Sequence, residues 1–208
     1  MKIISIINQK GGVGKTTTVI NLASALSQQD KKILVIDLDP QGNATTGLGL
    51  PNTDRSDETI YGILNGTKAI SEVIKNTSFK NLDLITSNVD LSGLEVETAG
   101  DNDRAFILKS KLTPYLNDSG RYYDYILIDC PPSLSLLTVM ALVSSNSLLV
   151  PLQTEFFALE GLTQLMKTIE RIKMNLNPEL DIQGILLTMY DKRNKLSFQV
   201  EQEARNYF

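Results

Sequence analysis

The chain has 208 residues, of which 42% are hydrophobic and 21% charged, a composition typical of one globular domain. Its formal net charge of −4 excludes a uniformly basic nucleic-acid-binding surface, so any DNA contact must come from a local basic patch. The single cysteine, Cys130, excludes an intramolecular disulfide, and the absence of histidine excludes histidine-based triads and metal sites.

Short apolar runs alternate with helical patterns along the chain. The apolar runs predict strands at residues 2–7, 32–37, 82–86, 125–129, 147–150 and 182–189. The helical patterns predict helices at residues 15–29, 59–64, 103–116, 133–144, 159–176 and 196–207. Strands rich in Ile, Leu and Val, separated by helices, indicate an α/β fold with a mainly parallel central sheet and helices on both faces.

Residues 41–57 are rich in Gly, Asn, Thr, Pro and Asp, and we expect them to form one long loop. No signal peptide or apolar run of bilayer length is evident, so a cytoplasmic protein without membrane contact is expected. We expect a single domain over residues 1–208. Because the chain stops inside a helical pattern with no cap, we also expect it to be truncated at its C-terminus.

Residues 8–17, NQKGGVGKTT, join the first predicted strand to the first predicted helix. Glycines at this point allow backbone N–H groups to turn inward around phosphate oxygens, and the helix adds its positive N-terminal end. The loop residues proper are Gly11, Gly12, Val13 and Gly14. Lys15 would then reach the β- and γ-phosphates of a nucleotide, with the Thr16 hydroxyl on Mg²⁺.

This loop departs from the usual phosphate-loop pattern at two positions. The pattern G-x-x-x-x-G-K-[ST] requires glycine at position 9, where this chain has Gln9, and Lys10 adds a second lysine. A phosphate loop has no evident need of a second cation for its own nucleotide.

Acidic residues follow two of the predicted strands. Asp37 and Asp39 end the strand at 32–37, and Asp129 ends the strand at 125–129. The carboxyl ends of parallel strands form the ligand crevice, so Asp37 and Asp39 could reach Mg²⁺ or an attacking water, unless one merely caps the loop. Asp129 would bind Mg²⁺, and Cys130 is interpreted as a packed thiol.

The loop after the last predicted strand carries Lys192, Arg193 and Lys195. Two interpretations stay open for this cluster: a solvated surface, or contact with a phosphate backbone.

KGGVGKTT at 10–17, with its early lysine, resembles the deviant Walker A motif of the ParA/MinD group of ATPases. DLDPQGNAT at 37–45, IDCPPS at 128–133 and TEFFALEGL at 154–162 resemble the ParA (Soj) branch, which segregates chromosomes and plasmids. The resemblance covers essentially the whole chain. It implies a P-loop NTPase that hydrolyses ATP to ADP and phosphate, slowly when alone.

The resemblance also implies site roles. Lys15, Thr16 and Thr17 match the residues that bind phosphate and Mg²⁺ within one subunit. Lys10 matches the lysine that reaches the partner's phosphates in an ATP-dependent homodimer, and Asp39 matches the residue that positions the attacking water.

Further implied features concern partners. The ATP-bound dimer would bind DNA without sequence preference on the nucleoid, and Arg193 falls at a basic position that the family uses for this contact. A ParB-type centromere-binding protein would stimulate hydrolysis and release the dimer.

Two features qualify the resemblance. The first strand starts at Lys2, without an N-terminal helix-turn-helix domain, and the family continues past Phe208 with a segment that contacts the adenine. The alternatives are a MinD-like membrane ATPase that places the division site, a metabolic P-loop enzyme, and an adaptor that binds nucleotide without hydrolysis. An iron–sulfur reductase with this loop would need two cysteines per subunit, which this chain lacks.

Overall fold

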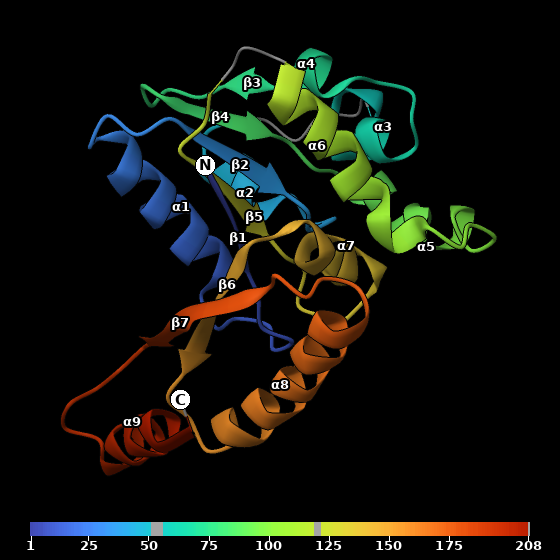
Figure 1. The fold of residues 1–208 in the computed structure, drawn as a ribbon. Helices are drawn as coiled ribbons and strands as arrows, with labels where there is room; N and C mark the ends of the chain where they lie inside the picture. Colours follow the sequence, from blue (N-terminus) through green and yellow to red (C-terminus); the bar gives the residue numbers. More distant parts are fainter. Residues whose placement is uncertain (51–55, 119–121, 208) are drawn as a thin grey trace.

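The computed structural model describes residues 1–50, 56–118 and 122–207. Within them a central sheet has the strand order β3-β4-β2-β5-β1-β6-β7, and the pairings are parallel except between β3 and β4 (Figure 1). The strands are β1 (Lys2–Ile6), β2 (Ile33–Asp37), β3 (Lys75–Asn76), β4 (Leu82–Ile85), β5 (Tyr125–Asp129), β6 (Ser147–Gln153) and β7 (Asp181–Thr188). The predicted parallel α/β sheet is confirmed. The polar two-residue β3 was missed because it is too short to show an apolar alternation.

All six predicted helices are present, with shifted ends. The helices are α1 (Lys15–Ser27), α2 (Asn43–Gly47), α3 (Ile60–Leu64), α4 (Ile70–Val73), α5 (Leu94–Glu97), α6 (Ile107–Asp118), α7 (Leu136–Ser144), α8 (Ala158–Asn175) and α9 (Lys195–Tyr207). Three 3₁₀ turns lie at Ser56–Glu58, Val89–Gly93 and Arg104–Phe106. In the described part of the chain, none of the helices is both long and apolar enough to cross a membrane.

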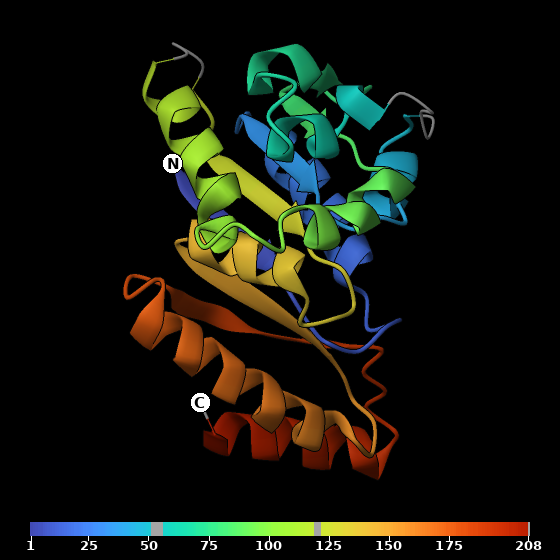
Figure 2. The same ribbon diagram turned by 90° about the vertical axis from the view of Figure 1, so that its right-hand side faces the viewer.

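The central strands of the sheet are buried on both faces, whereas the edge strands β3 and β7 are partly exposed. In β2, Ile33 and Val35 belong to the core beneath α1, whereas Leu34 and Ile36 belong to the core beneath α3, α6, α7 and α8. Figure 1 shows α1 on one side of the sheet and α6–α8 on the other. Figure 2 shows α9 running alongside α8, beneath β7. Two-sided burial is why the strands consist of continuous apolar runs rather than alternating ones.

The predicted loop at 41–57 is wrong over residues 43–47, which form α2. The chain enters this helix through Gly42, whose φ of 63° lies in the left-handed region that favours glycine. Ala44 and Leu48 are buried, so the segment packs against the protein despite its polar composition. The 3₁₀ turn Ser56–Glu58 shortens the loop further, and residues 51–55 lie outside the described residues.

Strand register brings the glycine loop and two acidic residues together at the C-terminal ends of the central strands. Ile6, the last residue of β1, is paired with Asp129 of β5, and Asp37 of β2 is paired with the same Asp129. The glycine loop follows β1 directly. The glycine loop, Asp37 and Asp129 therefore lie side by side at the C-terminal ends of the parallel strands, where α/β sheets of this kind bind ligands.

We expect Ile36→Ala to lower the free energy of unfolding by about 2–5 kcal/mol, because it opens a cavity in the core one residue before Asp37. Urea unfolding followed by circular dichroism measures the change. Val89→Ala, on an exposed turn, is the matched control and should change stability by less than about 0.5 kcal/mol. Equal effects of the two substitutions would contradict the placement of Ile36.

Candidate nucleotide-binding site

The glycine loop has the backbone of a phosphate cradle. Gly12 and Gly14 have φ values of 75° and 92°, which residues with a β-carbon adopt only with strain. Gly14 is the N-cap of α1, so the loop leads directly into the positive end of that helix. The Lys15 side chain is buried and folds back over the loop, where its ammonium donates a hydrogen bond to the Lys10 carbonyl oxygen at 3.0 Å.

Two side chains tie the loop to the sheet. Asn8 donates to the Pro151 carbonyl at 2.7 Å and accepts from the Lys10 N–H at 3.0 Å. The Thr188 hydroxyl, at the end of β7, donates to the Val13 carbonyl at 2.8 Å. The loop is therefore positioned by β6 and β7 before any ligand binds.

Gln9 has a structural role at the position where an ordinary phosphate loop has glycine. Its amide nitrogen donates to the Gly161 carbonyl oxygen of α8 at 3.1 Å and to the Gln164 side-chain oxygen at 3.3 Å. Glycine could make neither contact. The loop of this protein is thus attached to α8 as well as to the sheet.

Asp129 is fully buried, and neither of its carboxylate oxygens has a hydrogen-bond partner of ordinary geometry among the described residues. Burial raises its pKa to about 7, the charge of Asp37 adds to the rise, and the nearby Thr16 hydroxyl opposes it. A buried, unpaired carboxylate is costly unless a cation compensates it. Asp129 and the Thr16 hydroxyl are oxygen donors of the kind that Mg²⁺ prefers, so these residues fit the predicted ion.

Asp37 and Asp39 have different roles. Asp37 accepts hydrogen bonds from the Thr45 hydroxyl at 2.7 Å, the Thr45 N–H at 2.8 Å and the Asp39 N–H at 3.2 Å, so it holds the start of α2. Burial raises its pKa to about 6, against these hydrogen bonds. Asp39 is also buried and accepts from the Gln41 N–H at 3.0 Å. Asp37 therefore holds α2, and Asp39 holds the turn that precedes it.

The buried charges act on one another. Desolvation lowers the pKa of Lys15, while Asp129, Cys130 and Asp39 oppose this shift. Burial raises the pKa of Cys130, so the thiol stays neutral and is no nucleophile. Within the described residues, no group of three or more acidic, cysteine or histidine side chains is arranged to hold a metal. Mg²⁺ needs no such group, because substrate phosphates and water complete its coordination.

Lys10 lies at the rim of the site instead of among the buried acids. Its side chain is 46% exposed and forms an ion pair with Glu155, which follows β6. Thr17 is exposed on the first turn of α1, where its carbonyl accepts a hydrogen bond from Asn21 at 2.7 Å. The structure thus brings Lys15, Thr16, Asp39 and Asp129 together at the glycine loop, and leaves Lys10 facing outward.

Arg193 lies on the loop between β7 and α9. Its guanidinium donates to both carboxylate oxygens of Asp191, at 3.0 and 2.9 Å, and the arginine remains largely exposed. This pair was missed from the sequence, although an acid two residues before an arginine on a loop is a usable signal. Any anion that Arg193 binds must compete with Asp191.

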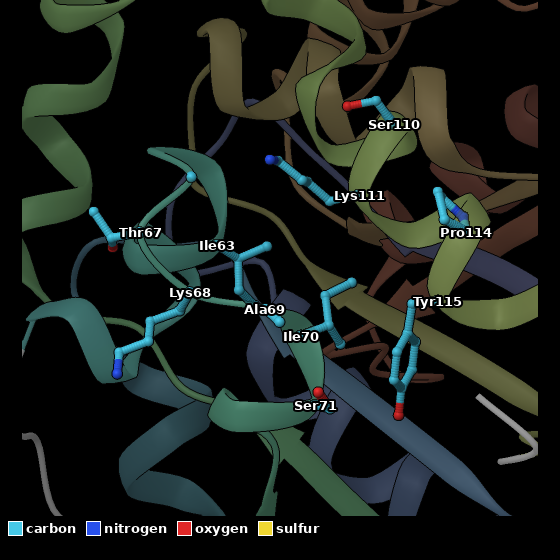
Figure 3. A pocket seen from close by; sticks show the side chains of 11 residues that line it. Ile63, Thr67, Lys68, Ala69, Ile70, Ser71, Ser110, Lys111, Pro114 and Tyr115 are labelled. Atoms are coloured by element: carbon cyan, nitrogen blue, oxygen red, sulfur yellow. The ribbon is translucent and has the colours of Figure 1, made fainter. Parts of the chain in front are cut away.

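A cavity of about 670 Å³ lies elsewhere, between α6 and the turn from α3 to α4 (Figure 3). Ile63, Ile70 and Tyr115 line it, and Lys111 lies over it from α6. None of the residues predicted for the nucleotide site lines this cavity. This cavity is therefore separate from the predicted nucleotide site.

A strand, a glycine loop, a buried lysine and a buried acid on the adjacent parallel strand define a P-loop nucleotide-binding protein. Residues 1–182 match a family model described as an AAA domain. The chromosome partitioning protein ParA of Caulobacter vibrioides is 50% identical over 208 residues, which cover 100% of this chain and 77% of the relative. The sporulation initiation inhibitor protein Soj of Bacillus subtilis is 46% identical over 207 residues, covering 100% of this chain and 80% of Soj. The chain belongs to the ParA/Soj family of chromosome-partitioning proteins.

A solved structure supports the same fold. Cobyrinic acid a,c-diamide synthase from Mycobacterium smegmatis, with bound ADP and magnesium, aligns with a TM-score of 0.91 and 35% sequence identity. The alignment covers 100% of this chain and 82% of that one. That protein therefore shares the whole described architecture, in a nucleotide-bound state.

We expect Asp129→Asn to stabilise the nucleotide-free protein near pH 8, because it removes a charge whose burial outweighs the favourable effects of the Thr16 hydroxyl and Lys15. The pKa of Asp129 rises from 3.8 to about 7 on folding, so the folded state binds more protons between these values and wild-type stability falls as pH rises through them. The gain should be at least about 1 kcal/mol, or roughly 2–4 °C in Tm, near pH 8 and vanish near pH 4.

Thermal unfolding at both pH values measures this gain. Asp37→Asn is the matched control. It should destabilise the protein by about 1–3 kcal/mol near pH 8, because its amide group would face the Thr45 donors. A gain for Asp129→Asn that is the same at both pH values would contradict the assignment.

Proposed function

We propose that this protein is an ATPase that partitions DNA, in which an ATP-dependent dimer binds DNA without sequence preference. The observation that carries the proposal is the fully buried Asp129 carboxylate, which lies beside Thr16 and Lys15 at the glycine loop. Membership of the ParA/Soj family supports the biological role.

The chain's own groups would hold the nucleotide. Backbone N–H groups of residues 11–14 and the positive end of α1 would bind phosphate oxygens. Lys15 would exchange its bond to the Lys10 carbonyl for the β- and γ-phosphates. Thr16 and Asp129 would hold Mg²⁺, which when bound supplies charge neutralisation for phosphoryl transfer.

Asp39 would orient the attacking water. It is buried at the carboxyl edge, and its charge acts on both Lys15 and Asp129, so it lies at the centre of the site. In-line attack forms a bond from the water oxygen to the γ-phosphorus and breaks the bond to the β-phosphate oxygen. The protein would then catalyse the reaction by positioning the water and the nucleotide and by stabilising the charge that develops on the phosphate.

Lys10 would act on the nucleotide of a second subunit. It faces outward at the rim, so it does not crowd the phosphates of its own site. A lysine supplied in trans neutralises charge only in the closed dimer, much as an arginine finger does in other NTPases. Turnover by a monomer should therefore be slow.

DNA and a ParB-type centromere-binding protein are the proposed macromolecular partners. Arg193 is exposed and available to a phosphate backbone if it leaves Asp191. The ParB-type protein would stimulate hydrolysis and so release the dimer from DNA.

A small-molecule enzyme is the second candidate function, because the Mycobacterium smegmatis neighbour is described as cobyrinic acid a,c-diamide synthase. The partitioning relatives are closer in sequence, at 50% and 46% identity against 35%. ATP turnover measured with and without DNA and a ParB-type protein separates the two functions. A partitioning ATPase is stimulated by these partners, whereas an amidating enzyme requires its small-molecule substrate.

We expect three substitutions to separate binding, dimerisation and hydrolysis. Lys15→Ala should abolish ATP binding, because it removes the buried cation of the loop. Lys10→Ala should bind ATP yet remain monomeric, and Asp39→Ala should dimerise without hydrolysing ATP. Fluorescent-nucleotide titration, light scattering and phosphate release measure the three steps. Unchanged nucleotide affinity in Lys15→Ala would contradict the assignment of residues 11–15 as a phosphate-binding loop.

We expect Arg193→Ala to weaken binding of the ATP-bound protein to random-sequence duplex DNA and to reduce the slope of log affinity against log salt by about 1. Asp191→Ala is the matched variant. It frees the guanidinium and should strengthen DNA binding instead. Electrophoretic mobility shifts at several salt concentrations measure both. If both variants match the wild type, Arg193 does not contact DNA.

A further inference from the structure

The cavity of about 670 Å³ between α6 and the turn from α3 to α4 has the size of a small-molecule site (Figure 3). Its inner wall is apolar, because Ile63 and Ile70 are both buried members of the main core. Tyr115 adds an aromatic side chain from α6. A planar apolar group of a ligand would therefore make apolar contacts inside the cavity.

The turn that forms one wall of the cavity is held in place. The Gly62 carbonyl accepts hydrogen bonds from the Thr67 hydroxyl at 3.2 Å and from the Lys68 N–H at 3.0 Å. The Ala69 N–H donates to the Glu72 carboxylate at 2.7 Å. The fold therefore sets the shape of this wall before a ligand binds, so binding requires little ordering of the turn.

The wall formed by α6 has hydrogen-bonding capacity that the helix does not use in the regular way. Pro114 lies inside α6 and has no N–H, so the Ser110 carbonyl, four residues earlier, receives no regular helical hydrogen bond from it. Both residues line the cavity. The Tyr115 hydroxyl is buried and has no hydrogen-bond partner among the described residues. Both groups thus have capacity for a hydrogen bond to a polar group of a ligand.

Charge at the cavity favours an anion. Lys111 extends from α6 toward the turn, and its ammonium lies 3.8 Å from the position that a β-carbon on Gly66 would occupy (Figure 3). The other lysine of the lining, Lys68, is balanced by Asp57 and Glu72, each at 3.9 Å. Lys111, in contrast, forms no ion pair in the part of the chain that the structure describes. None of the described lining residues is acidic, so an anionic group would meet no carboxylate there.

We propose that this cavity binds a small aromatic anion, with its planar body against Ile63, Ile70 and Tyr115 and its negative group at Lys111. A neutral ligand would leave the Lys111 ammonium unpaired, and a cation would be repelled by it. The cavity shares no residue with the predicted nucleotide site, so the proposal goes beyond the proposed function and does not rest on it.

The test titrates the ¹⁵N-labelled chain with naphthalene-2-carboxylate, which combines an aromatic body with one negative charge. Naphthalene-2-methanol has the same body without the charge, and acetate has the charge without the body. Amide chemical shifts of residues 66–71 locate the bound probe and give its dissociation constant. Each titration is repeated with saturating Mg·ADP, so that binding at the nucleotide site is recognised.

Three variants test the side chains. Lys111→Gln removes the proposed cation, and Ser71→Trp fills the cavity from an exposed position on its rim. Lys109→Gln is the matched control, because Lys109 is exposed on the same helix but does not line this cavity. Thermal unfolding of each variant checks that the protein is folded.

We expect naphthalene-2-carboxylate to bind the wild type with a dissociation constant on the order of 1 mM, as a ligand of this size allows, and to shift the amides of residues 66–71. Lys111→Gln should weaken binding about three- to tenfold, and Ser71→Trp at least about tenfold. Lys109→Gln should bind within about twofold of the wild type. Naphthalene-2-methanol and acetate should each bind more weakly than the carboxylate, and Mg·ADP should change none of these results.

Four results would overturn the inference. They are unchanged amide shifts at residues 66–71, equal affinity for the neutral alcohol, equal weakening by Lys109→Gln and Lys111→Gln, and loss of binding when Mg·ADP is present. The last result would assign the probe to the nucleotide site. None of the four bears on the proposed ATPase, which is tested separately by nucleotide binding and phosphate release.

Discussion

The rest of the site depends on one unfavourable arrangement, an ionisable carboxylate that is fully buried at the end of a central strand. Parallel pairing of β5 with both β1 and β2 fixes Asp129 level with the glycine loop and with Asp37. No hydrogen bond of ordinary geometry satisfies its oxygens within the described residues, so the fold has a cost that a bound cation can remove. Ligand binding and stability are therefore linked through this one residue.

The two neighbouring acids of the site differ in their hydrogen bonds. Asp37 and Asp39 are two residues apart and both are buried. Two hydrogen bonds from Thr45 tie Asp37 to α2, and a third comes from the Asp39 N–H, so Asp39 is the acid that we propose acts on a ligand. Buried polar groups whose hydrogen bonds are made within the protein stabilise the fold, whereas those with free hydrogen-bonding capacity can bind a ligand.

The glycine loop connects the nucleotide site to the outer surface. Lys15 and the loop backbone face inward, whereas Gln9 and Lys10 reach α8 and Glu155. An ordinary phosphate loop with glycine at position 9 would lack the first of these links. The two departures from the usual pattern are thus the residues through which the loop contacts α8 and Glu155.

The sequence by itself determined the α/β class, the limits of six strands to within a few residues, and the place of the glycine loop between the first strand and the first helix. These are local properties, because apolar runs and glycine spacing act through neighbouring residues. It did not determine α2, the different hydrogen bonds of Asp37 and Asp39, or the contacts of Gln9, Lys10 and Arg193. Only the tertiary structure decided these, because each depends on contacts between side chains and the folded backbone that no local pattern specifies.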